Sequence, residues 1–189
     1  AKSTITWPSA VSSDSSNGTI AYAIANPTTF ISYNDSNNDW YYTGSSSTDN
    51  TRWTALDKAK SIYDPCPSGW RVPDGGEDGV WSKALGSSSY FTASSLYDYA
   101  NEGINFSGKF GSASIIWYPA PGNRQGSNGK IGIVGQRGNY WSTSPNNLHA
   151  YVLRFIKNGN IIPSTLNYRY QGLPVRCIKE ASVSSAPDV

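Results

Sequence analysis

The chain has 189 residues, enough for one ordinary domain with a core of its own. Hydrophobic residues make up 38% of it, aromatic residues 13% and charged residues only 15%, a composition that excludes an intrinsically disordered chain. The net charge of +2 provides no extended basic field, so we expect no binding to nucleic acid or to a lipid surface. No apolar run approaches the roughly 18 residues of a membrane-spanning helix, so no membrane insertion is expected.

Turn-forming residues are abundant. Eighteen Gly and eleven Pro, with many Ser, Thr and Asn, predict a loop-rich, mainly β protein. The sequence carries no signal peptide and no methionine. We therefore expect that residue 1 is not the native start and that the chain is a mature or excised C-terminal piece of a longer protein.

Alternating apolar side chains predict short strands in the N-terminal third. Ile20, Tyr22 and Ile24 would share one face of a strand that Asn26 and Pro27 end. Other predicted elements are strands at residues 5–7, 30–31 and 39–42, a loop at 44–50 and a helical turn within 54–60.

Two stretches far apart in the chain each place a cysteine beside an Arg/Val strand. Pro65 and Pro67 flank Cys66 and exclude a helix there, and a short strand follows at residues 70–72. The second stretch, residues 172–178, contains Cys177 within a predicted closing strand at 175–179. We expect the two to be neighbours joined by a Cys66–Cys177 disulfide, as suits an exported protein; the alternative is a pair of buried free thiols.

A short helix is predicted at residues 80–85, with Gly86 in the C-cap position. Its apolar face would consist of Val80, Trp81, Ala84 and Leu85. The carboxylates that precede it, Asp74, Glu77 and Asp78, have the oxygen chemistry of a Ca²⁺ site. We favour the simpler interpretation of a solvated turn in which Asp74 or Asp78 caps the helix, so no metal is expected.

The C-terminal half reads as a series of strands. They are predicted at residues 103–107, 114–118, 130–134, 138–143, 150–155 and 160–163. Asn158 and Gly159 form the strongest hairpin-turn dipeptide in the chain. In the 150–155 strand, Tyr151, Leu153 and Phe155 would face inward, with Val152 and Arg154 outward.

These motifs resemble the Fibrobacter succinogenes major paralogous domain, over roughly residues 55–180. The resemblance is carried by residues 66–73 with the following Trp-bearing helix, and by residues 140–144, 150–155, 163 and 169–177. Residues 26–30 and 39–44 look like the version fused to fimbrillin-type surface proteins of Bacteroidetes-like bacteria. The resemblance implies an α+β, C-type-lectin-like fold of mostly antiparallel short strands, one or two short helices and long loops.

The domain organisation expected from this resemblance has three parts. Residues 1–54 would form N-terminal strands and a loop integrated into the domain, residues 55–180 the core, and residues 181–189 a flexible tail. Trp70, Trp81 and Trp141 lie within the framework motifs, so we expect them in the core.

No coherent catalytic constellation is present, and we expect neither an enzyme nor a cofactor. His149 is the only histidine, there is no Gly-x-Ser-x-Gly elbow, and one His with two distant Cys makes no zinc pattern. Residues 71–73 before a helix do resemble an element of formylglycine-generating enzymes. Those enzymes need a reactive cysteine pair, whereas both cysteines here lie in framework motifs.

The predicted function is therefore that of an extracellular adhesin domain, the C-terminal or tip module of a fimbrial or surface protein. Its partners would be a surface glycan or protein, and other pilus subunits through missing N-terminal domains; a purely structural pilus module is the alternative.

Loops at 119–139, 143–149 and 164–171 would present the ligand-binding groups. Variable proteins of diversity-generating retroelements change residues in this part of a similar fold, although ordinary loop composition explains the residue types here equally well. The predicted ligand surface consists of Asn146, His149, Val152, Arg154, Asn167, Tyr168 and Tyr170.

Overall fold

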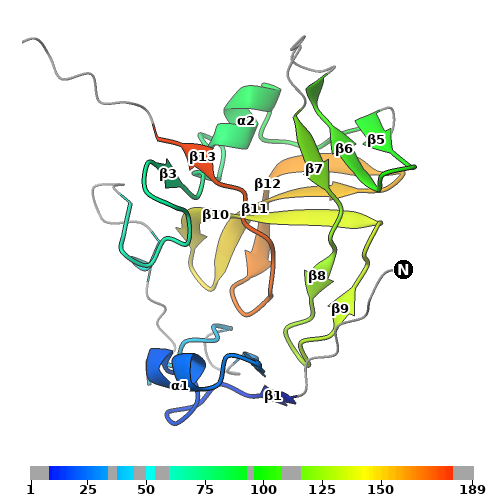
Figure 1. Ribbon diagram of the computed structural model, residues 1–189. Helices are drawn as coiled ribbons and strands as arrows, with labels where there is room; N and C mark the ends of the chain where they lie inside the picture. The colour runs from blue at the N-terminus through cyan, green and yellow to red at the C-terminus, as the bar shows by residue number, and fades with distance from the viewer. Residues whose placement is uncertain are drawn as a thin grey trace, which may run out of the picture.

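The computed structural model describes residues 9–33, 38–44, 50–53, 60–92, 96–107 and 116–180. Within these ranges the protein consists of small β-sheets and two short helices, so the expected α+β class is confirmed (Figure 1). The predicted strand at residues 5–7, most of the predicted helical turn at 54–60 and the predicted tail at 181–189 lie outside the described residues. Among the described helices none is long and apolar enough to cross a membrane.

The largest sheet is antiparallel, with strand order β10-β11-β12-β4. Its strands are β10 (Arg137–Asn146), β11 (His149–Ile156), β12 (Asn160–Tyr168) and β4 (Phe91–Thr92). The turn at Asn158 is confirmed, with φ of 59° in the left-handed region that asparagine tolerates. β10 and β12 extend further than predicted, so residues 143–146 and 164–168 are strand rather than loop.

Four smaller sheets surround this one. β5-β6-β7 is antiparallel, β8-β9 is a hairpin, β1 pairs with β2 in parallel, and β3 pairs antiparallel with β13. Their strands are β1 (Ser9–Val11), β2 (Thr29–Ile31), β3 (Trp70–Arg71), β5 (Tyr97–Asp98), β6 (Gly103–Asn105), β7 (Trp117–Pro119), β8 (Asn123–Arg124), β9 (Ile131–Gly132) and β13 (Ile178–Lys179). Residues 39–42 form no strand, although the sequence predicted one.

Helix α2 (Val80–Leu85) is found where the sequence predicted it. Gly86 ends it at φ of 69°, and its backbone N–H donates to the carbonyls of the last turn. The residue at the N-cap is Gly79, so the expectation that Asp74 or Asp78 caps the helix is wrong. The buried face consists of Trp81, Ser82 and Leu85, whereas Ala84 is exposed.

Residues 20–24 form helix α1 (Ile20–Ala25), not the predicted strand. The sequence alternates, but every second residue is alanine, which has the highest helix propensity. Thr19 supplies the N-cap, because its Oγ1 accepts a hydrogen bond from the Tyr22 N–H at 3.1 Å. The N-cap and the helix propensity of alanine therefore prevail over an alternating pattern that consists of only three apolar positions.

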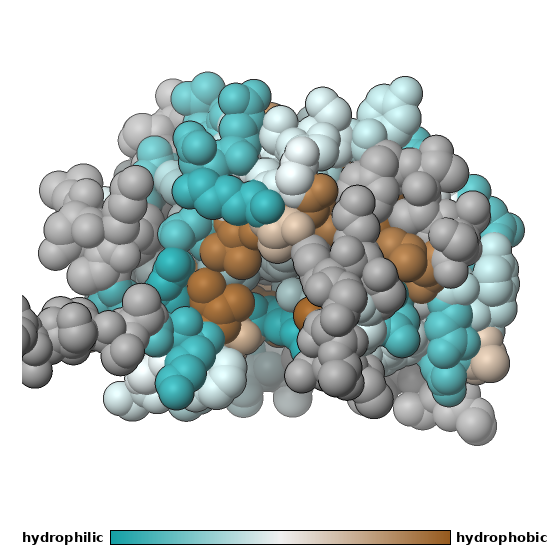
Figure 2. Space-filling view, turned by 90° about the horizontal axis from the view of Figure 1, so that it is seen from above, coloured by the Kyte–Doolittle hydropathy of each residue, from teal (hydrophilic) through white to brown (hydrophobic). Residues whose placement is uncertain are grey.

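The core lies between one face of the large sheet, α2 and the β5-β6-β7 sheet. Tyr118 occupies its centre, edge-on to Phe106 at 5.4 Å and to Tyr140 at 5.0 Å between ring centroids. Buried hydroxyls are satisfied: Tyr140 donates to the Pro119 carbonyl at 2.6 Å, and Tyr97 to the Gly135 carbonyl at 2.8 Å. Seen from the α2 side, hydrophobic residues gather in the middle of the face, with hydrophilic residues around them (Figure 2).

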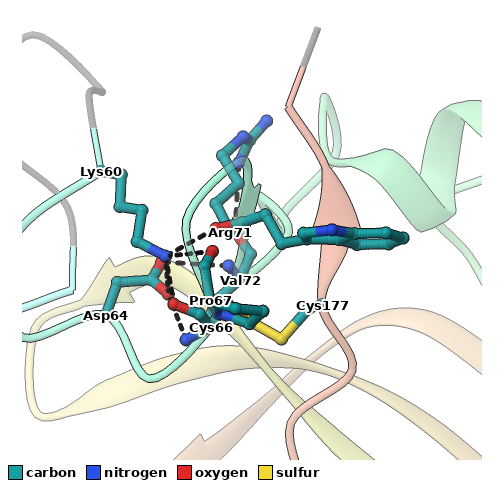
Figure 3. The surroundings of a disulfide bond; sticks show 8 residues. Lys60, Asp64, Cys66, Pro67, Arg71, Val72 and Cys177 are labelled. Carbon is teal, nitrogen blue, oxygen red and sulfur yellow. Dashed lines mark hydrogen bonds and ion pairs between the residues drawn. A yellow bond between two sulfur atoms is a disulfide. The ribbon is translucent and has the colours of Figure 1, made fainter.

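The Cys66–Cys177 disulfide predicted from the sequence is present, and the prediction is confirmed. It joins residues 111 apart beside the β3–β13 pair, so nearly the whole described core lies between its ends (Figure 3). In the chain-entropy model, closing a loop of that length lowers the entropy of the unfolded chain and so raises the free energy of unfolding by about 4–5 kcal/mol. Trp70 is 43% exposed, so its predicted place in the core is wrong; Trp81 and Trp141 are buried as expected.

A polar cluster lies directly beside the disulfide (Figure 3). The buried carboxylate of Asp64 accepts from the Cys66 N–H at 2.8 Å and from the Val72 N–H at 3.0 Å. Lys60 Nζ lies 3.5 Å from this carboxylate and also donates to the carbonyls of Cys66, Pro67 and Trp70. The proline-rich segment has few N–H donors of its own, and these two side chains fix its course.

Replacing Asp64 with Ala is expected to lower the free energy of unfolding by about 3 kcal/mol, because two buried N–H donors and Lys60 lose their acceptor. Equilibrium urea denaturation measures this. Asp78→Ala, at an exposed position in the turn before α2, serves as the control and should change stability by less than about 0.5 kcal/mol. Equal stability of the two variants would contradict the structural role given to Asp64.

A second prediction concerns alkaline pH. Burial raises the pKa of Tyr140 far above its usual value of 10.0, and burial raises that of Tyr97 as well. Their stabilising effect is therefore complete below pH ~10, where unfolded tyrosines are protonated, and declines as the pH rises further. Urea denaturation between pH 8 and pH 11.5 should show this decline, and Tyr140→Phe should reduce its slope. A slope unchanged in Tyr140→Phe would contradict the assignment.

Candidate ligand-binding surface

The turn between β10 and β11 and the end of β12 meet at one end of the large sheet. Asn146 lies opposite His149, and His149 lies opposite Tyr168. Asn147 in the turn has a φ of 50°, which lies in the left-handed region that asparagine tolerates. The strand register therefore brings together three of the predicted ligand residues from separate parts of the sequence.

Four rings contact one another in succession at this end of the sheet, and we call them the aromatic ladder: His149, Tyr168, Tyr170 and Tyr33. Ring centroids lie 4.5 Å apart for His149 and Tyr168, and 5.2 Å apart for Tyr168 and Tyr170, the latter pair almost parallel at 9°. Tyr33 adds the fourth ring, 4.7 Å from Tyr170. Tyr168 remains 40% exposed, so the ladder presents an accessible aromatic face.

Tyr170 is held by the segment that contains β8. Its ring lies so close to Gly126 that a Cβ there would come within 1.8 Å of Cδ2, so only glycine fits. The next residue, Gln171, accepts from Asn123 Nδ2 at 2.7 Å, and Gly172 exchanges backbone hydrogen bonds with Arg124. Burial raises the pKa of Tyr170, which remains a neutral phenol at physiological pH.

Arg169 holds the β10–β11 turn, which carries His149 of the ladder. Its guanidinium donates to the carbonyls of His149 at 3.1 Å and Asn147 at 2.7 Å, which hold the β10–β11 turn. The same group lies 3.8 Å from the carboxylate of Asp39 and donates to Asn50 Oδ1, so it also binds the N-terminal segment. The planar fork of arginine suits such a junction, because it presents several donors in fixed directions.

Two of the predicted ligand residues are buried, and two others are only partly exposed. Val152 is fully buried and Asn167 is 9% exposed, so their predicted places on the surface are wrong. Val152 does lie on the face away from the core, but Trp141 opposite it is buried too, so both sides of the sheet are covered here. Arg154 is half-buried, and its Nε donates to Asn139 Oδ1 at 2.8 Å. Asn146 is partly accessible, with its amide donating to the Tyr151 hydroxyl at 2.9 Å.

A cavity of about 610 Å³ lies between the N-terminal segment and the large sheet. Tyr170 belongs both to its lining and to the ladder, so the two features adjoin. Arg52 lies in this lining, 4.2 Å from the ring centre of Tyr41 and 5.0 Å from that of Tyr63. The lining aromatics include Phe30, Trp40, Tyr41, Trp53, Trp141 and Tyr170. Sequence reasoning missed Tyr33 and this N-terminal contribution, because nothing local to those residues indicates contacts more than 100 positions away.

The acidic turn before α2 is engaged in protein contacts. Asp74 pairs with Arg71 at 2.8 Å and accepts from Thr143 Oγ1 at 3.2 Å, whereas Glu77 and Asp78 are exposed. Across the described ranges, no three His, Cys, Asp or Glu side chains come together as a metal site would require. Both cysteines are bonded to each other.

Comparisons with protein-family models, with curated proteins and with solved structures found no match to this chain.

Arg169→Gln should loosen the N-terminal segment, because glutamine cannot contact Asp39, Asn50 and the β10–β11 turn together. Hydrogen exchange followed by mass spectrometry should show faster exchange in residues 38–44, with residues 150–156 unchanged. Lys179→Gln removes a positive charge at an exposed position and should leave both regions as in the wild type. Equal protection of residues 38–44 in Arg169→Gln would mean that this arginine does not hold the segment.

Proposed function

We propose that this protein is a non-catalytic recognition domain of an extracellular surface or fimbrial protein, and that it binds its ligand through the aromatic ladder. The observation that carries the proposal is the row of contacting rings formed by His149, Tyr168, Tyr170 and Tyr33 at the end of the large sheet. Aromatic rings offer a large contact area with few rotatable bonds, so little conformational entropy is lost when they bind. Amide groups of Asn146, Asn147 and Gln171 lie around the ladder and supply hydrogen bonds.

The ligand class that fits this surface is a glycan or a protein exposed on another cell. Sugar rings and protein side chains both pack against tyrosine faces, and neighbouring amides can then hydrogen-bond to hydroxyls or to peptide groups. The ladder is held by Arg169 and by strand register, so it is preorganised before the ligand arrives.

We further propose a C-type-lectin-like fold, as in the domain family that the framework motifs resemble. Its support is that the two motifs pair through β3 and β13 and through the disulfide, closing the chain between them. The disulfide also supports export to an oxidising compartment, because such bonds persist mainly outside the cytosol. A structural pilus module without a ligand of its own is the alternative that the following experiment separates.

Tyr168→Ala should weaken binding about 30-fold, equivalent to about 2 kcal/mol, because a central exposed aromatic residue is lost from the contact. Glycan and host-protein arrays probed with the wild-type domain would identify the ligand, and biolayer interferometry would then give the dissociation constants. The melting temperature should stay within about 2 °C of the wild-type value, since Tyr168 is 40% exposed and lies outside the hydrophobic core.

Tyr90→Ala is the matched control, because Tyr90 is 66% exposed and lies outside the ladder. It should bind as the wild type does. Wild-type affinity in Tyr168→Ala would reject the ladder as the binding surface. No binding of the wild-type domain to either array would favour a structural module.

A further inference from the structure

The cavity between the N-terminal segment and the large sheet has walls built mainly from aromatic side chains. Its volume of about 610 Å³ is within the range of roughly 300–1,000 Å³ that is usual for small-molecule sites. In Figure 1 the N-terminal segment with α1 lies below the large sheet, so the two walls come from distant parts of the chain. The aromatic residues of the walls are Phe30, Trp40, Tyr41, Trp53, Trp141 and Tyr170.

Trp141 provides a hydrogen-bond donor that no protein group uses. The residue lines the cavity and is only 7% exposed, yet its indole N–H donates to no acceptor within the described ranges. This N–H is not among the fully buried polar atoms, so a small molecule can reach it. Trp81, which is equally buried, donates its indole N–H to the Tyr118 hydroxyl at 3.2 Å. Because buried tryptophans usually find such a partner, the free N–H of Trp141 is a donor for a molecule in the cavity.

Charged side chains of the cavity lining are engaged with other protein groups. The carboxylate of Asp39 lies 3.8 Å from the guanidinium of Arg169 and also accepts from the Tyr41 N–H at 3.2 Å. The guanidinium of Arg52 packs over the rings of Tyr41 and Tyr63. Ring faces and uncharged donors therefore remain as the means of recognition, and they favour a neutral ligand.

The strand edge beside the cavity is closed to a peptide. The Trp141 N–H donates to the Pro174 carbonyl at 3.1 Å, and Leu173 and Val175 on either side of Pro174 line the cavity. Peptides often bind by adding a strand to an open edge, which β10 does not offer here. A sugar ring needs no such edge, because its C–H faces pack against aromatic rings and its hydroxyls form single hydrogen bonds.

We propose that this cavity binds the terminal, neutral sugar ring of a glycan, with the Trp141 indole N–H donating to an oxygen of that ring. Tyr170 belongs to both the cavity lining and the ladder, so the sugars that follow the terminal one would lie along the ladder. This inference deepens the proposed function and rests on it, because it takes the protein to be a recognition domain and selects a glycan as the ligand.

The test is an NMR titration of the wild-type chain that follows the indole N–H signals of its tryptophans. The probes are the methyl glycosides of D-galactose, D-glucose, D-mannose, N-acetyl-D-glucosamine and L-fucose, and N-acetyl-L-tyrosinamide represents a peptide side chain. At least one glycoside should shift the Trp141 signal and saturate in the millimolar range, while the signal of Trp81 stays unchanged. The proposal is overturned if no glycoside shifts the Trp141 signal, and a shift with N-acetyl-L-tyrosinamide alone would indicate a peptide ligand instead.

Two matched variants make the assignment specific. Trp141→Phe keeps an aromatic ring in the wall but removes the donor, so it should weaken glycoside binding at least tenfold, measured at the backbone amide signals of residues 171–173. Trp70→Phe is the same change at a position that is 43% exposed and outside the cavity lining, and it should bind as the wild type does. Wild-type affinity in a folded Trp141→Phe would overturn the proposal. The titration of the wild-type chain decides without any variant having to fold.

The ladder variant separates this inference from the proposed function. Tyr168 does not line the cavity, so Tyr168→Ala should leave the titration with a single sugar ring unchanged. Loss of array ligand binding in Tyr168→Ala, with no glycoside shifting Trp141 in the wild type, would reject the cavity site and leave the ladder standing. A glycoside titration at Trp141, with wild-type ligand binding in Tyr168→Ala, would reject the ladder and leave the cavity site standing.

Discussion

The Cys66–Cys177 disulfide, with the Lys60–Asp64 cluster beside it, is the constraint on which the rest of the structure depends. It fixes two extended segments, and both continue directly to the outer edge of β10. There the Thr143 N–H donates to the Pro73 carbonyl at 3.0 Å, and the Trp141 N–H donates to the Pro174 carbonyl at 3.1 Å. An edge strand that would otherwise expose its donors is covered in this way. The position of β10 then determines the register of β11 and β12.

The large sheet is covered on both faces, and different parts of the chain provide the cover. On one face, Leu153 and Phe155 pack into the aromatic core with α2 and the β5-β6-β7 sheet. On the other, Val152 and Trp141 are equally buried, and the N-terminal segment lines a cavity beside Trp141. Arg169 connects that segment to the β10–β11 turn, so an element with little core of its own becomes part of the surface that carries the ladder. Rigidity at this end of the sheet follows from these contacts, and a rigid aromatic surface is what recognition by display requires.

One end of the large sheet carries the surface proposed for recognition. Near the β10–β11 turn, the rings of the aromatic ladder and the amides around it form a neutral face suited to apolar and hydrogen-bonding contacts. Tyr170 also lines the cavity between the N-terminal segment and the sheet, so this surface continues into that cavity.

The sequence by itself determined the features whose cause is local. Gly86 ends α2, Asn158 makes the β11–β12 turn, and the alternation around Leu153 marks the strand face that enters the core. A single pair of cysteines in two similar contexts also sufficed for the disulfide. The tertiary structure alone decided which second faces are covered, and so whether Val152 and Trp70 are buried or exposed. It also placed Tyr33 against Tyr170. The physical reason is that periodicity records which residues point the same way, whereas burial and charge pairing depend on segments that fold back from distant parts of the chain.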